Sequence, residues 1–65
     1  MKRYYFNLLT EDYEDLEAPI PDGSSKTAAA KIAKKWMVEK GIKSASLQAN
    51  SIKTEEILDW IYIEV

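Results

Sequence analysis

The stretch Ile57-Leu-Asp-Trp-Ile-Tyr-Ile-Glu-Val65 decides the fold, because a short run dense in β-branched and aromatic residues is typical of a strand. A strand sends successive side chains to opposite faces of a sheet. One face of this strand receives four aliphatic residues, Ile57, Ile61, Ile63 and Val65. The other face receives Leu58, Trp60 and Tyr62. Both faces are therefore apolar, and a single helix can cover only one of them.

The orientation of this strand has two solutions. We expect the aliphatic side, with Ile61, Ile63 and Val65, to face the core. Trp60 and Tyr62 would then lie behind the sheet together with Tyr5, since aromatic residues with a polar group suit a half-exposed face. The opposite orientation stays open, because it would turn Asp59 toward solvent. Either way an apolar patch remains, unless long side chains and the acidic loop cover it within the monomer.

The only good helix is predicted over residues 26–40, a run rich in Ala and Lys that ends before Gly41. Asp22 or Ser24 can cap its first turn. Helical periodicity gathers its apolar residues on one broad arc, with Trp36 in the core. That arc contains Ala28, Ala29, Ile32, Ala33, Trp36 and Met37. The opposite arc is basic and carries Lys31, Lys34 and Lys35.

Two further strands are predicted over residues 3–9 and 44–50, the second with Ala45, Leu47 and Ala49 on its inward side. The acidic segment 11–17 leaves a short additional strand over 13–18 open. These elements predict one domain over residues 1–65 with an α+β fold. The fold has two layers, with one amphipathic helix packed on one face of a three- or four-stranded, mostly antiparallel sheet in the order ββαββ or βαββ.

Three features resemble a group of short bacterial proteins of unknown function with a ββαββ layout. They are the opening Arg3-Tyr-Tyr-Phe-Asn-Leu8, the Pro21-Asp22 lead into an Ala-rich helix, and the closing hairpin. The resemblance spans most of the chain in order. The chain departs from the pattern because its acidic segment lacks a glycine turn and its helix is rich in Lys. The resemblance implies the fold and a bacterial source, and it carries no functional residues.

The composition narrows the possible functions. The chain has 65 residues without Cys or His, which excludes disulfides and the usual zinc ligands and removes the commonest general base. We therefore expect no catalytic, cofactor or metal site, and no enzyme. The spacing of carboxylates in the acidic segment does not match a calcium-binding loop. Because neither a signal peptide nor a membrane span is recognisable, we expect a cytoplasmic protein without membrane association.

The sequence predicts a small self-associating interaction module. Its candidate interface is the sheet face with Tyr5, Trp60 and Tyr62, and a homodimer is the simplest product. An unidentified protein partner stays open. The alternative is a nucleic-acid-binding accessory protein that uses either that aromatic face or the basic face with Lys31, Lys34 and Lys35. The net charge of −2 makes nucleic acid the less favoured partner.

Overall fold

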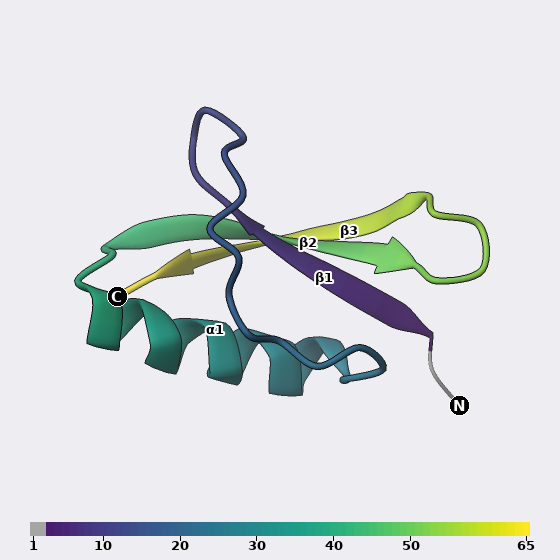
Figure 1. The fold of residues 1–65 in the computed structure, drawn as a ribbon, viewed down its shortest axis with the longest axis horizontal. Coiled ribbons are helices and arrows are strands. Elements are labelled where there is room, and N and C mark those ends of the chain that lie inside the picture. The colour runs from purple at the N-terminus through teal and green to yellow at the C-terminus, as the bar shows by residue number, and fades with distance from the viewer. Residues whose placement is uncertain (1–2) are drawn as a thin grey trace.

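The computed structural model describes residues 3–65 and has an α+β fold of two layers (Figure 1). Its elements follow in the order β1 (Tyr4–Leu9), α1 (Lys26–Lys40), β2 (Ser44–Ser51) and β3 (Ile57–Glu64). The three strands form one antiparallel sheet in the order β1-β2-β3, and α1 packs on one of its faces. The predicted fold class is therefore confirmed, in its βαββ form.

The core lies between α1 and the strands, with the central strand β2 in its middle. The inward residues of β2 are small apart from Leu47, so they let the helix approach closely. The helix faces them with residues spaced four apart, which recur on one side of a helix. The buried cluster comprises Phe6, Leu8, Ala29, Ala33, Met37, Ala45, Leu47, Ala49 and Ile63.

The favoured orientation of β3 is correct for Ile63, which is buried, and for Ile61, which packs half-buried against the core. It is wrong for Val65, whose side chain is 51% exposed because it follows the last residue of β3 and lies beyond the core cluster. Trp36 was predicted in the core but is only half-buried. Ala33 and Met37 occupy the centre of the helix face, and Trp36 packs at its flank.

The ends of α1 explain its length. Ser25 is the N-cap, and its Oγ accepts a hydrogen bond from the Ala28 N–H at 3.1 Å. The prediction of Asp22 or Ser24 as the cap is wrong, because the Ser24 hydroxyl instead donates to the carbonyl of Pro21 at 2.7 Å. Gly41 ends the helix as predicted, with a left-handed φ of 74° that favours glycine.

The segment between β1 and α1 is not a second strand. It makes one isolated antiparallel bridge, between Leu9 and Asp15, and then continues irregularly along the outer edge of β1. The Leu16 N–H donates to the Leu8 carbonyl and the Gly23 N–H donates to the Tyr4 carbonyl, both at 2.8 Å. The segment also packs Leu16, Ala18 and Ile20 against the core. It therefore covers the edge of β1 with the chain's own backbone.

Candidate functional site

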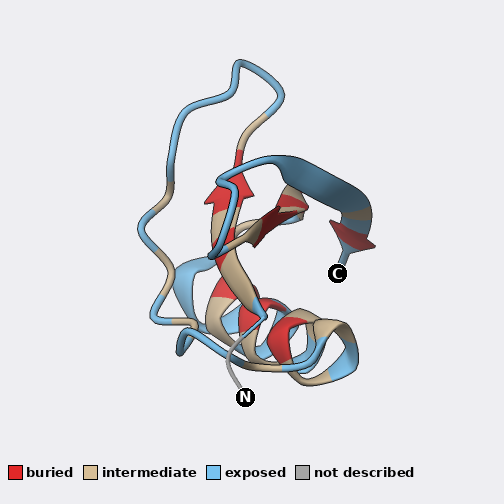
Figure 2. Cartoon of the chain, turned by 90° about the vertical axis from the view of Figure 1, so that its right-hand side faces the viewer, coloured by how far each residue is buried: buried red, intermediate tan, exposed pale blue. Residues whose placement is uncertain are grey.

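Several of the large exposed apolar side chains of residues 3–65 are concentrated along β3. Figure 2 shows this strand exposed along most of its length, with Ile63 as its buried position, whereas β1 and β2 each carry several buried positions. Three large side chains form what we call the aromatic surface, with exposed fractions of 74% for Tyr13, 44% for Trp60 and 62% for Tyr62. An apolar patch of this kind marks an interaction site more often than it marks ordinary surface.

Tyr5 does not join this surface. It lies half-buried on β1, the opposite edge strand, where it stands across from Asn50. The strand between them turns polar side chains to the back of the sheet, and there the Asn7 amide donates to Gln48 at 3.0 Å. Of the three predicted interface residues, the structure therefore brings together only Trp60 and Tyr62. The apolar region is a stripe along one edge and does not extend across the whole face.

Tyr13 was missed by the sequence analysis. Its ring meets the ring of Trp60 edge-on, with 6.1 Å between the two centroids, so the acidic segment reaches the aromatic surface. Tyr13 is the only aromatic residue within the acidic segment 11–17. A single aromatic ring among acidic residues was the sequence feature that could have indicated a packing contact. The contact covers the patch only in part, because both rings stay substantially exposed.

Within residues 3–65, no strand pairs with the backbone groups on the outer edge of β3. The Val65 N–H donates to the Lys43 carbonyl at 2.8 Å, on the side of β2. In an antiparallel ladder alternate residues direct both backbone groups to the same neighbour. Ile63 and Ile61 therefore bind β2, whereas Tyr62 and Trp60 direct their N–H and C=O groups away from it. This open edge is a template for strand addition.

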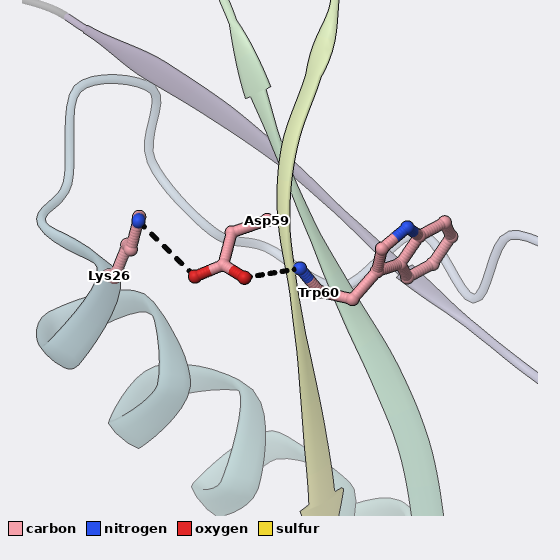
Figure 3. A network of polar contacts seen from close by, with 3 residues as sticks. All are labelled: Lys26, Asp59 and Trp60. Atoms are coloured by element: carbon pink, nitrogen blue, oxygen red, sulfur yellow. Dashed lines mark hydrogen bonds and ion pairs between the residues drawn. The ribbon is translucent and has the colours of Figure 1, made fainter.

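One side chain, that of Asp59, forms a hydrogen bond with a backbone N–H at that edge. The Trp60 N–H donates to Asp59 Oδ1 at 2.9 Å, and Asp59 Oδ2 pairs with Lys26 Nζ at 3.2 Å (Figure 3). The hydrogen bond from Lys26 is the main cause that lowers the pKa of the Asp59 carboxyl below 3.8, and the Trp60 N–H adds to it. The Lys26 ammonium also lies 5.5 Å from the ring centroid of Tyr4. This network links the start of α1 to the middle of β3.

A groove runs between α1 and the outer side of β3, with a volume of about 480 Å³ and an open mouth. Ala30 and the inward residues Ile61 and Ile63 give it an apolar lining. Lysines of the helix border it, because the helix turns its flank rather than its apolar arc toward this edge. The remaining lining residues are Lys26, Thr27, Lys31, Lys34, Tyr62 and Glu64.

The predicted basic face is exposed, and the structure divides it. Lys31 and Lys34 border the groove, whereas Lys35 is exposed outside it. Lys26 belongs to the groove as well and was missed, because it is the first residue of the helix and was not assigned to the lysine arc. Within residues 3–65 the structure contains one ion pair, Lys26 with Asp59. The acidic segment makes none there with the lysines of the helix.

Comparisons with protein-family models, with curated proteins and with solved structures find no match to this chain. Among residues 3–65, no three acidic side chains lie close enough together to hold a metal ion. The helix of the described region is too short and too polar to cross a membrane. The edge of β3, the aromatic surface and the groove are the features of residues 3–65 that suggest a function.

Proposed function

We propose that this protein is a self-associating module in which two copies pair edge to edge through β3. The observation that carries the proposal is an open strand edge of eight residues with apolar side chains on both of its sides. Antiparallel pairing of β3 with the β3 of a second copy joins the two three-stranded sheets into one continuous sheet. Such a dimer has two-fold symmetry, the commonest arrangement of protein oligomers.

The sequence of β3 is self-complementary in one register. When Ile61 lies on the two-fold axis, Trp60 stands opposite Tyr62 of the second copy, and Leu58 stands opposite its Glu64. Trp60 and Tyr62 direct their backbone groups outward, so they can exchange hydrogen bonds across the new interface, whereas Leu58 lies at a shift in the register of β3 against β2. No two like charges within β3 then face each other. Centring the pair on Trp60 instead would oppose Glu56 of one copy to Glu64 of the other.

Pairing in this register uses both apolar sides of the strand. Behind the sheet, the Trp60 and Tyr62 rings of the two copies become cross-strand neighbours, an arrangement that stabilises antiparallel pairs by about 0.2–1 kcal/mol each. On the core side, Ile61 of the second copy lies next to the groove with its apolar lining. We favour a second copy of this chain as the partner of β3, because the residues that complement one another all belong to this one strand.

A proline at an outward position tests the strand pairing directly. Tyr62→Pro removes an N–H that points away from β2, so it leaves the ladder of the monomer intact and blocks the new one. Tyr62→Ala is the matched control, because it removes the same ring and keeps the N–H. We expect sedimentation equilibrium to give a dimer for the wild type, a weakened dimer for Tyr62→Ala and a monomer for Tyr62→Pro. A wild-type monomer at every concentration contradicts the proposal.

A second candidate function is binding of nucleic acid by the helix. Lys31 and Lys34 are exposed beside the groove and make no ion pair within residues 3–65, which favours an external anion. The effect of added salt on binding distinguishes the two candidate functions. Binding to phosphates weakens steeply with added salt. The proposed dimer brings the lysines of both helices to the same side of the joined sheet, so added salt should strengthen it. No binding to RNA or DNA at low salt removes the second candidate.

A further inference from the structure

We infer that Lys26, Asp59 and the Trp60 N–H form an edge latch, an autoinhibitory contact that limits pairing of β3 with a second copy. This inference rests on the proposed function and concerns the regulation of the same edge. The latch is a contact of the monomer alone. It occupies the Trp60 N–H, which lies near the middle of the strand and points away from β2.

The geometry of the latch is specific to this edge. Asp59 belongs to the side of the strand that faces the core, where it stands across from Ala49 of β2. A charged residue on that side of an edge strand is a recognised obstacle to edge pairing. Its carboxylate reaches back to the N–H of the next residue, 2.9 Å away, while its other oxygen is held by Lys26. Asp59 therefore satisfies a donor that strand addition would need.

Because Lys26 takes part, the latch joins the helix to β3 and is not confined to Asp59 and the adjacent Trp60. It is the first residue of α1, so the helix determines where its ammonium lies. The ammonium contacts both the Asp59 carboxylate and the face of the Tyr4 ring, which keeps it beneath the sheet. The pair is 38% and 46% exposed for Lys26 and Asp59 respectively, so water can replace either partner and the latch can open without unfolding.

Strand pairing and the latch are mutually exclusive because both use the Trp60 N–H. In the register centred on Ile61, the Trp60 N–H donates to the carbonyl of Tyr62 in the second copy. The Asp59 carboxylate must leave that N–H first, and it must do so in both copies. The free energy of two charge-assisted hydrogen bonds therefore opposes dimerisation. Opening the latch in advance should lower the dissociation constant of the dimer by about tenfold or more.

Alanine variants of two acidic residues test the latch. Asp59→Ala removes the acceptor and one negative charge. Glu56→Ala is the matched control, because it removes one negative charge from an exposed residue just before β3, outside the paired residues, without freeing an edge N–H. Asp59→Asn keeps an acceptor for the Trp60 N–H and weakens only the ion pair. Dissociation constants come from sedimentation equilibrium, and circular dichroism checks that each variant is folded.

We expect Asp59→Ala to dimerise about tenfold more tightly than Glu56→Ala, with Asp59→Asn between them. If the wild type dimerises and the two alanine variants match, the latch is overturned and the proposed function stands. If the wild type and Asp59→Ala both stay monomeric at millimolar concentration, the proposed function fails and the latch fails with it. A wild type that dimerises only at a higher concentration than Asp59→Ala supports the latch.

Discussion

The two edge strands of this sheet differ in whether the rest of the chain covers their outer backbone groups. The edge of β1 is covered by the chain itself, because the segment after it donates backbone hydrogen bonds to Leu8 and Tyr4 and packs three apolar side chains on the core. Among the described residues 3–65 the edge of β3 has no such cover, and the Asp59 carboxylate is the one group that hydrogen-bonds to an outward N–H of this strand. This small domain therefore covers one edge of its sheet with its own chain and leaves the other edge strand available for pairing.

The contrast extends to the side chains. Leu8 on β1 is 1% exposed, whereas Leu58 on β3 is 50% exposed, although both lie on edge strands of the same sheet. Burial of a leucine contributes to stability only when folding removes it from water. We therefore expect β1 to determine the stability of the monomer and β3 to determine what the monomer binds.

The largest expected effect comes from the same truncation on the two edges. Leu8→Ala leaves a cavity in the core and should reduce the free energy of unfolding by about 2–5 kcal/mol, enough to unfold much of a marginal domain. Leu58→Ala should change it by about 0.5 kcal/mol or less in the monomer. Urea denaturation at low protein concentration measures both. Equal losses for the two variants would contradict the division between the edges.

An intermediate effect is expected on association. Trp60→Ser should leave the monomer folded, since Trp60 is half-exposed, and should raise the dissociation constant of the dimer by about tenfold or more. Tyr5→Ser, on the opposite edge strand, should leave that constant unchanged. Sedimentation equilibrium with circular dichroism measures affinity and folding together. An unfolded Trp60→Ser variant, or a dimer weakened equally by Tyr5→Ser, would place the interface elsewhere.

The smallest effect concerns the latch. NMR titration should show that the Asp59 carboxyl has a pKa below its ordinary 3.8 and that Lys26→Met raises it. Lys31→Met is the control and should not change it. Because the folded-state pKa is lowered, the contribution of this carboxylate to stability is complete above the unfolded-state pKa and is lost as the pH falls through the folded-state value. An unchanged titration in Lys26→Met would rule out the pairing.

Much of the fold could be predicted from the sequence, because alternation and helical spacing are local signals. The small inward residues of β2 and the orientation of Ile63 followed from these patterns. The errors occur at residues whose burial depends on tertiary contacts rather than on the local sequence. Trp36 lies at the flank of the helix face because Met37 fills the centre, and only the packed structure distinguishes the two positions.

The candidate site was predicted less completely. Trp60 and Tyr62 were identified by their parity along the strand. Tyr5 has the same parity but belongs to the far edge, and strand order cannot be read from alternation. Tyr13 and Lys26 reach the site from segments distant in the sequence, so nothing in the local pattern of either residue indicated its partner.

Hydrogen exchange at the outward amides of β3 shows whether this strand edge pairs with a second copy. The amides of Tyr62 and Glu64 should exchange rapidly at low concentration and become protected as the mass rises from 7.5 kDa toward twice that value. The amide of Leu16, which binds the edge of β1, should be protected at every concentration. A mass that stays at 7.5 kDa at millimolar concentration, with the Tyr62 and Glu64 amides still unprotected, would contradict the account.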